Sequence, residues 1–224
     1  RQRQMCIRDR CSSIVFIEVL KMVLSDGMIR NLAINQRMLV PFEENRLQAV
    51  SYDISSGKVA VVYRNVDQSI DLRNKDLVQF VTRDIDISNG YHIKPNEYIL
   101  IKTKERFAIP SNITAHIRPR TTFTKLGLTV SCQHMNPNFQ GYLYLGLYNA
   151  TPNIIDIYPD LVIAQMVFEE VKGEITKEKL YDHKKDAKYQ NEDEFIAPQY
   201  DQLDDTEKVR VDNIINRMLG RENV

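Results

Sequence analysis

Short runs of apolar and β-branched residues alternate with turn signals over most of the chain. Turns are indicated at Ser56-Gly57, Asn89-Gly90 and Thr151-Pro152-Asn153. Strands at this regular spacing, without helices between them, are typical of all-β barrels and sandwiches such as the jelly roll. The pattern therefore predicts a mainly β fold. The runs that we expect to form strands are Lys58 to Tyr63, Leu77 to Thr82, Tyr98 to Thr103, Ile113 to Ile117, Thr129 to Cys132, Tyr142 to Tyr148 and Leu161 to Phe168.

A short helix is predicted before the strands. Ser25 or Asp26 can cap it, and Met28, Ile29 and Leu32 would form its apolar face. The residues before Met22 carry no hydrophobic period, so we expect residues 1–21 to be a non-native or disordered leader outside the fold.

A charge-rich segment follows Gly173 and includes KEKLYDHKKDAKYQNEDEF, which we interpret as an extended arm. Taken alone, such a run is usually a solvated tail. Beyond it, Thr206 can cap a second helix, which Gly220 would end. The expected organisation is thus a β domain with its arm over residues 22–199 and a carboxy-terminal helix over 200–224. The apolar stripe of that helix, which we expect to pack in the core or between subunits, consists of Val211, Ile214, Ile215 and Met218.

Composition narrows the class of protein. The 224 residues are 43% hydrophobic, enough for one sizeable core. Thirty basic residues balance thirty acidic ones, which argues against a nucleic-acid groove or a membrane surface. The three cysteines have no paired spacing, as expected in a reducing cytoplasm, and the apolar run near residues 12–20 is too short to span a bilayer. We expect a cytoplasmic protein without membrane or nucleic-acid partners.

The segment IRPRTTFTKLGL carries the clearest candidate chemistry. Arg120, Thr121, Thr122 and Lys125 supply donors that bind phosphate oxygens. The alternative for such charges is ordinary surface placement beside a turn. The neighbouring NPNFQG turn and the strand around Gly146 offer no ionisable acid, so a nucleotide site is favoured over a catalytic one.

Several familiar sites are absent from the sequence. There is no GxxxxGK[ST], no GxGxxG and no zinc-deaminase signature. Cys132 and His134 are too few ligands for a closed metal site, so no protein-bound metal is expected. For Tyr52 and Asp53, strand-end packing and turn formation are favoured over a role in the site, because Asp favours turns.

Six segments in order carry a resemblance to a known family. They are QAVSYDISSGK (Gln48 to Lys58), IKPNEYILIKTKERFAIP (Ile93 to Pro110), RTTFTKLGL (Arg120 to Leu128), NPNFQGYLYLGLYN (Asn136 to Asn149), IAQMVFE (Ile163 to Glu169) and YDHKKDAKYQNE (Tyr181 to Glu192). This chain resembles the dCTP deaminases, which belong with the dUTPases to one superfamily, over roughly residues 22–199. The Lys-Tyr-Gln of the arm is similar to the deaminase branch.

The resemblance implies a distorted jelly roll, or dUTPase-like β-barrel, assembled as a homotrimer with active sites between neighbouring subunits. It implies hydrolytic deamination of dCTP to dUTP in pyrimidine deoxynucleotide metabolism. Deaminases of this family use no zinc, and Mg²⁺ accompanies the triphosphate.

Position by position, Arg120, Thr121, Thr122 and Lys125 match the family's Arg-Ser-Ser-x-x-Arg, which holds phosphates and supports the catalytic water. Lys125 keeps the charge of the second arginine without its planar fork. The resemblance also implies that Gln165 is another phosphate-side residue and that Tyr181 and Lys188 are arm residues that close over the nucleotide. It implies further nucleotide contacts at Asn136, Tyr144, Leu145 and Glu192.

Three positions depart from the family in ways that oppose the reaction. The resemblance implies that the catalytic glutamate corresponds to Gly146 and the aspartate that faces the deoxyribose to Asn136. It implies that a glutamine of the arm corresponds to Glu192, which would place a negative charge close to the polyphosphate. Positioned acid–base catalysis contributes about 10² to 10⁴ to such a rate. Two hypotheses remain open: a dCTP deaminase-like enzyme with weak or relocated catalysis, for which Glu105 is the nearest acid in sequence, and a non-catalytic trimer that binds nucleotide or acts as a scaffold.

The strand around Gly146 predicts how its two faces are used. Leu143, Leu145 and Leu147 alternate with tyrosines, so the leucines should face the core and the tyrosines should share the face of Gly146. The gap above Gly146 can admit a base that stacks, or a neighbouring side chain can fill it.

Overall fold

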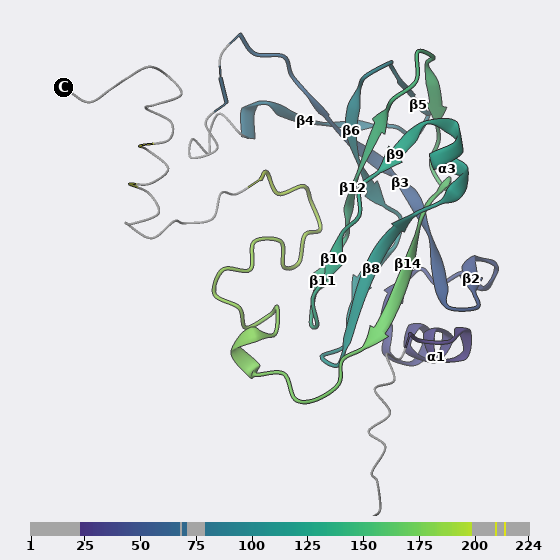
Figure 1. Ribbon diagram of the computed structural model, residues 1–224, viewed down its shortest axis with the longest axis vertical. Helices are drawn as coiled ribbons and strands as arrows, with labels where there is room; N and C mark the ends of the chain where they lie inside the picture. Colours follow the sequence, from purple (N-terminus) through teal and green to yellow (C-terminus); the bar gives the residue numbers. More distant parts are fainter. Residues whose placement is uncertain (1–22, 68, 71–78, 199–208, 210–212, 214–224) are drawn as a thin grey trace, which may run out of the picture.

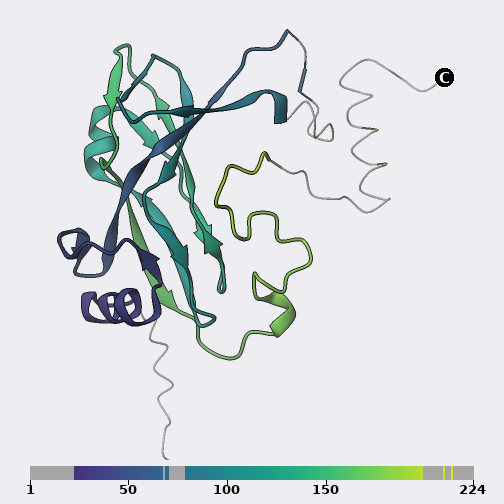
Figure 2. The same ribbon diagram turned by 180° about the vertical axis from the view of Figure 1, so that it is seen from behind.

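The computed structural model describes residues 23–67, 69–70 and 79–198, with residues 209 and 213. Curled antiparallel sheets form its body (Figures 1 and 2). Helix α1 (Asp26–Gln36) lies against one side of the sheets, and the arm, from residue 171 to 198, runs along the other. The predicted mainly β, jelly-roll-like fold is confirmed.

The largest sheet has the order β10-β8-β14-β3-β6-β12-β9, with β2 and β4 also paired to β3. A second sheet has the order β1-β7-β11, and β13 pairs with β5. The strands of the largest sheet are β2 (Leu47–Gln48), β3 (Ser51–Tyr63), β4 (Thr82–Asp86), β6 (Tyr98–Thr103), β8 (Ile113–Pro119), β9 (Leu128–Val130), β10 (His134–Met135), β12 (Tyr144–Asn149) and β14 (Val162–Glu170). The shorter sheets contain β1 (Leu39–Val40), β5 (Tyr91–Ile93), β7 (Arg106–Ala108), β11 (Gln140–Gly141) and β13 (Ile155–Ile157).

Alternation along the strands places the core. Leu145 and Leu147 of β12 are fully buried, and Leu143 just before the strand is nearly so. Because successive side chains of a strand point to opposite faces, the tyrosines take the other face together with Gly146. The predicted use of the two faces of this strand is confirmed.

Most predicted strands match within a few residues, and the run from Tyr98 to Thr103 coincides with β6. The run from Leu77 to Thr82 is wrong where the structure describes it, since residues 79–80 are helical and the strand is β4. Helix α3 (Thr121–Leu126) was not predicted, and it ends at Gly127 with φ of 77°. Short 3₁₀ turns, η1 and η2, occupy Glu44–Arg46 and Lys177–Lys179.

Helix α1 begins where the sequence predicts, with Ser25 as its N-cap residue, although no side-chain bond caps it. Its buried residues are Ile29 and Ala33, and Leu32 packs partly against the core. Met28 is 41% exposed, so its assignment to the apolar face is wrong. Turning by about 100° per residue places Met28 beside the buried stripe rather than on it.

The predicted leader over 1–21 lies outside the described residues, as does the helix from Thr206 to Met218 apart from residues 209 and 213. None of the helices among the residues described is long and apolar enough to cross a membrane.

Candidate functional site

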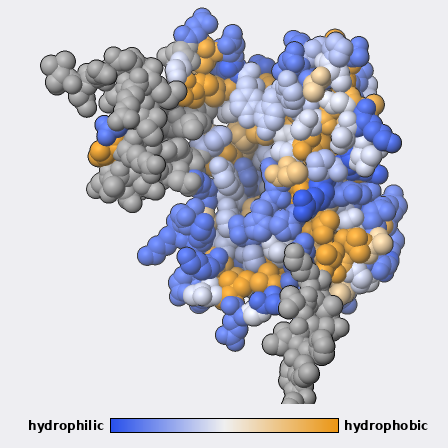
Figure 3. Space-filling model, viewed as in Figure 1, coloured by the Kyte–Doolittle hydropathy of each residue, from blue (hydrophilic) through white to orange (hydrophobic). Residues whose placement is uncertain are grey.

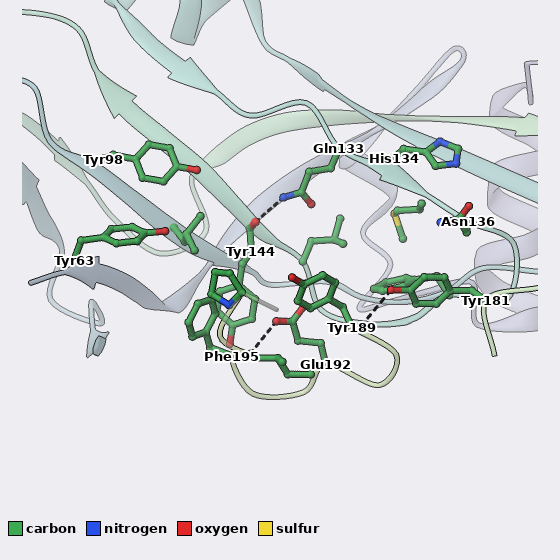
Figure 4. Close-up of a pocket in the computed structure, with 16 residues that line it drawn as sticks. Tyr63, Tyr98, Gln133, His134, Asn136, Tyr144, Tyr181, Tyr189, Glu192 and Phe195 are labelled. Atoms are coloured by element: carbon green, nitrogen blue, oxygen red, sulfur yellow. Dashed lines mark hydrogen bonds between the residues drawn. The ribbon is translucent and has the colours of Figure 1, made fainter. Parts of the chain in front are cut away.

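A cleft of about 480 Å³ lies between β6, β12 and the arm, and we call it the aromatic cleft (Figure 4). The surface is hollowed between the arm and the sheets on the face shown in Figure 3. Seven of its sixteen lining residues are Phe or Tyr, and apolar and aromatic walls of this kind are typical of pockets that bind small molecules. Its polar and aromatic lining residues are Tyr63, Tyr98, Gln133, His134, Asn136, Phe139, Tyr144, Tyr181, Tyr189, Glu192 and Phe195.

The arm wall of this cleft is anchored at Gly141. Residues 141 and 192 form a parallel bridge, and the Tyr142 N–H donates to the Glu192 carbonyl at 2.9 Å. Gly141 has φ of 137°, and a Cβ there would lie 2.8 Å from the Glu192 nitrogen. Only glycine therefore permits this approach of the arm to the strand.

Side chains extend this anchor along the arm. The Gln190 amide accepts from the Gln140 N–H at 3.1 Å and donates to the Asn138 carbonyl at 3.0 Å. The Phe195 ring meets Tyr144 edge-on, with centroids 5.2 Å apart. The Lys-Tyr-Gln segment of the sequence is thus folded onto its own chain and does not extend away as a solvated tail.

The strand wall of the cleft is closed above Gly146. A Cβ at residue 146 would lie 2.1 Å from the Tyr98 hydroxyl oxygen and 2.7 Å from the ring carbon that bears it. Tyr98 pairs with Tyr148 across the β6–β12 ladder, so its ring leans diagonally over the glycine. Tyr63 packs beside it, with ring centroids 5.8 Å apart. Of the two sequence alternatives for the gap, the neighbouring side chain is the one found.

Glu192 places a carboxyl in the cleft from the arm side. Only 8% of the residue is exposed, and its Oε1 accepts a hydrogen bond from the Ile196 N–H at 3.0 Å. Burial raises the pKa of Glu192 to about 7, although the Ile196 N–H and the charge of Lys102 pull in the opposite direction. Sequence reasoning assigned Glu192 to the nucleotide site but did not reveal this environment.

Asn136, Tyr144 and Leu145, also predicted to contact the nucleotide, expose different groups to the cleft. Asn136 follows β10 and lines the cleft, where its amide can both donate and accept. Tyr144 lines it too, and its carbonyl accepts from the Gln133 side chain at 2.7 Å. The Leu145 side chain is fully buried in the core, so only its main chain can face a ligand.

The predicted phosphate residues lie elsewhere in the chain. Arg120 and Thr122 line a second cleft of about 560 Å³, together with Arg46, and we call it the Arg120 cleft. Within the described residues, the two clefts share no lining residue. Thr121 and Lys125 are exposed on α3. Tyr181 lines the aromatic cleft, whereas Lys188 lies on the arm without lining either one.

Arg120 and Gln165 converge on a carboxylate that the sequence assigned to a turn. Asp53 lies within β3 and is 5% exposed. Arg120 Nη1 is 3.6 Å from its Oδ2, and the Gln165 amide donates to Oδ1 at 3.3 Å. Gln48 donates to the same carboxylate at 3.2 Å. Asp53 therefore holds two predicted phosphate-site residues in place, and its turn assignment is wrong.

Glu105, the acid nearest in sequence to the candidate chemistry, lines neither cleft. It is 1% exposed, and its two carboxylate oxygens accept from the Ser55 N–H at 3.0 and 3.2 Å. Burial raises its pKa to about 7. Its geometry is that of a core carboxyl that satisfies a buried backbone donor.

Comparison with known proteins places the chain. A family model described as dCTP deaminase-like matches residues 23–171. The chain belongs to the dCTP deaminase-like family. It is 30% identical over 159 residues to the dUMP-forming dCTP deaminase of Sulfurihydrogenibium sp. strain YO3AOP1, a match that covers 70% of this chain and 88% of the relative. It is 28% identical over 184 residues to the dCTP deaminase of Campylobacter concisus strain 13826, covering 78% and 96% of the two chains.

A solved structure of this family supports the fold. The 2'-deoxycytidine 5'-triphosphate deaminase from Agrobacterium tumefaciens matches with a TM-score of 0.56 and 20% sequence identity. The match covers 67% of this chain and 49% of that one, so about half of the Agrobacterium chain has no counterpart in it. The fold predicted from the resemblance is confirmed by this likeness.

Proposed function

We propose that this protein binds a pyrimidine deoxynucleoside triphosphate, dCTP or dUTP, in the aromatic cleft and does not deaminate it by the family's glutamate. The observation that carries the proposal is the Tyr98 hydroxyl, which occupies the space into which a side chain at residue 146 would project. Glycine has no proton to transfer, and the tyrosine keeps a water molecule from taking the place of the carboxylate. The space beside residue 146 therefore lacks the acid and is also filled by the Tyr98 side chain.

The lining of the cleft supports nucleotide binding. Tyr144 and Phe195 offer aromatic faces on which a base can stack, an interaction worth about 1–3 kcal/mol per base. Asn136 offers an amide to a sugar hydroxyl. Tyr181 and Tyr189 from the arm cover the same space, and the Tyr181 hydroxyl accepts from the Tyr189 N–H at 3.2 Å.

The proposed site needs a second copy of the chain for the phosphates. Arg120 and Thr122, which the family resemblance assigns to the phosphates, line a cleft separate from the one that holds Asn136. We therefore propose a homotrimer in which the Arg120 cleft of one subunit adjoins the aromatic cleft of the next. The proposed place of action is the cytoplasm, where these nucleotides are made and used.

Magnesium would come with the triphosphate. The described residues contain no group of three or more His, Cys, Asp or Glu side chains arranged to hold a metal ion. Mg²⁺ usually keeps several waters and takes phosphate oxygens plus one or two carboxylates, so the triphosphate itself can carry the ion into the site. Its role would be to neutralise phosphate charge.

Calorimetric titration and a turnover assay test the proposal. We expect dCTP with Mg²⁺ to bind, no dUTP or dUMP to appear, and light scattering to give a trimer mass. Formation of deaminated product by the unchanged protein would refute the loss of deamination. Failure of both dCTP and dUTP to bind the trimer would refute nucleotide binding and favour the scaffold function.

A pair of double variants tests whether the rest of the site is intact. Gly146→Glu with Tyr98→Leu restores an acid and removes the ring that blocks it, and we expect deamination to become measurable. Gly146→Gln with Tyr98→Leu has the same shape without the acid and should remain inactive. Equal activity in the two variants would show that the carboxyl at residue 146 is not what the site lacks.

A further inference from the structure

The aromatic cleft has one carboxyl among its described lining residues, and it comes from the arm. Glu192 is more than nine-tenths buried, and its Oε1 accepts a hydrogen bond from the Ile196 N–H. Figure 4 shows the carboxyl among aromatic side chains of the cleft. A ligand ring that enters this space therefore meets a carboxyl at its edge.

The charges around Glu192 do not neutralise it. The positive charge of Lys102 of β6 lowers the pKa of Glu192. The Lys102 ammonium, however, donates to the Asp193 carbonyl and lies 4.2 Å from the centre of the Tyr142 ring. Tyr144 of β12 and Tyr189 of the arm line the same space, as does His134 of β10. Other acids lie nearby. Glu194 is exposed, and the charge of Asp84 of β4 helps to raise the pKa of Tyr144.

The two protonation states of such a carboxyl differ in hydrogen bonding. A carboxylate can only accept hydrogen bonds, whereas a protonated carboxyl both donates and accepts. A ring amino group donates, so it suits either state. A ring carbonyl only accepts, so it suits the protonated acid and is repelled by the carboxylate.

We propose that Glu192 distinguishes an amino from an oxo substituent on the ring of the bound base, and that it favours the amino form when it is ionised. The inference rests on the proposed nucleotide binding in this cleft. It assigns selectivity for cytosine-type over uracil-type bases to a residue of the arm.

The size of the effect follows from burial. A buried acceptor that faces another acceptor loses its hydrogen bond and gains no substitute, and such mismatches discriminate strongly between ligands. We expect dCTP to bind about tenfold more tightly than dUTP when Glu192 is ionised. When Glu192 is protonated, the ratio of the two affinities should approach one. Burial raises the pKa of this group to about 7, which places the change near neutral pH.

The test measures dissociation constants of dCTP and dUTP, both with Mg²⁺, at about pH 6 and about pH 8. The ratio of the two affinities removes the titration of the triphosphate, which both ligands share. We expect the ratio to rise about fivefold toward dCTP between the two pH values, because ionisation is still incomplete at about pH 8. Glu192→Gln should give a ratio that does not change with pH, because its amide donates and accepts in both conditions.

Glu194→Gln is the matched control, because it removes a carboxyl two residues away that is exposed on the same arm. Its ratio should follow that of the unchanged protein. A pH dependence of the ratio that survives in Glu192→Gln would assign the effect to a group other than Glu192 and overturn the proposal.

The remaining outcomes separate this inference from the function on which it rests. Tight binding of both nucleotides with an affinity ratio near one at both pH values would overturn the role of Glu192 and leave nucleotide binding standing. Absence of binding by either nucleotide would overturn the proposed function itself. Limited proteolysis of the arm in each variant verifies that the substitution has not released it.

Discussion

Glu105 and Glu192 are two buried carboxyls whose pKa values burial raises alike, each to about 7, yet they lie in different surroundings. Glu105 sits in the core and binds the Ser55 N–H with both oxygens. Glu192 opens onto a cleft and binds the Ile196 N–H with one. Perturbed pKa values cluster at functional sites but also occur in structural networks. The two carboxyls differ in whether a ligand can reach them, and a raised pKa alone does not reveal this difference.

The largest expected effect concerns the core carboxyl. The folded pKa of Glu105 lies above its unfolded value of 4.5, so the folded state binds the proton more tightly. The stabilisation is complete below pH 4.5 and is lost as the pH rises through about 7, by about 3 kcal/mol in the free energy of unfolding. Glu105→Gln should remove the share of the decline that Glu105 contributes, as measured by urea unfolding at about pH 5 and pH 8. The pKa of Glu192 is raised as well, so its share of the decline should remain.

Glu43→Gln is the control for that experiment. Its hydrogen bond from Lys104 lowers the pKa of Glu43, so its contribution changes below pH 4.5 and should leave the decline intact. If the Glu105→Gln protein loses stability with pH as much as the unchanged protein, the pKa of Glu105 is not raised by its burial. The comparison of Glu105 with Glu192 would then fail.

The second prediction separates the two carboxyls by releasing one of them. Gly141→Ala places a Cβ 2.8 Å from the Glu192 nitrogen at a backbone φ of 137°, and we expect it to weaken docking of the arm by about 2 kcal/mol. Protease cleavage within residues 180–198 should accelerate accordingly. Glu105 is not attached to the arm, so its share of the pH dependence of global unfolding should remain, whereas the share of Glu192 should be lost. Gly173→Ala, also at positive φ but with no atom within 4 Å of the added Cβ, controls for backbone strain alone.

The third prediction adds another carboxyl to the cleft. Gly146→Glu meets the tip of the Tyr98 ring, which must rotate away, and we expect a loss of about 1.5 kcal/mol in the free energy of unfolding. Adding Tyr98→Leu should recover most of the loss, which a double-mutant cycle measures as a coupling energy. Additive losses in the two single variants would mean that Tyr98 does not constrain residue 146.

The smallest expected effect is that of the Lys102 charge on the pKa of Glu192. The charge of Lys102 lowers the pKa of Glu192, so Lys102→Met should shift its titration to higher pH, with a free-energy change of about 0.5 kcal/mol. Carbon-detected NMR of the glutamate carboxyl reports the midpoint. Arg106→Met is the control, because Arg106 holds Asp193 at 2.8 Å without acting on Glu192. Equal shifts in both variants would point to movement of the arm.

Local alternation was enough to predict the body of the fold. Leu145 and Leu147 are buried because strand geometry places every second residue on one face, and this rule needs no knowledge of the partner strands. The helix α3 was missed because its two threonines at the start favour strands or turns, and its stability derives from the burial of Phe123 and from the positive φ of Gly127.

The site was predicted only in part, because its geometry depends on contacts between distant segments. The resemblance named Asn136, Tyr144, Tyr181 and Glu192, and the structure brings all of them to one cleft. The cover that Tyr98 places over Gly146 follows from the register of β6 against β12, which sequence alone does not set. The wrong turn assignment of Asp53 has the same origin, because its partners come from three other elements.

The division of one chain into two clefts has a thermodynamic consequence. If a nucleotide spans the aromatic cleft of one subunit and the Arg120 cleft of the next, only the assembled form offers it a complete set of contacts. By mass action, the ligand then favours assembly by the same free energy by which assembly strengthens its binding. On dilution, the nucleotide would lose its phosphate contacts, which the neighbouring subunit supplies, before it loses its contacts to the base. The fraction of the protein that is trimeric would then depend on the ratio of nucleotide to protein.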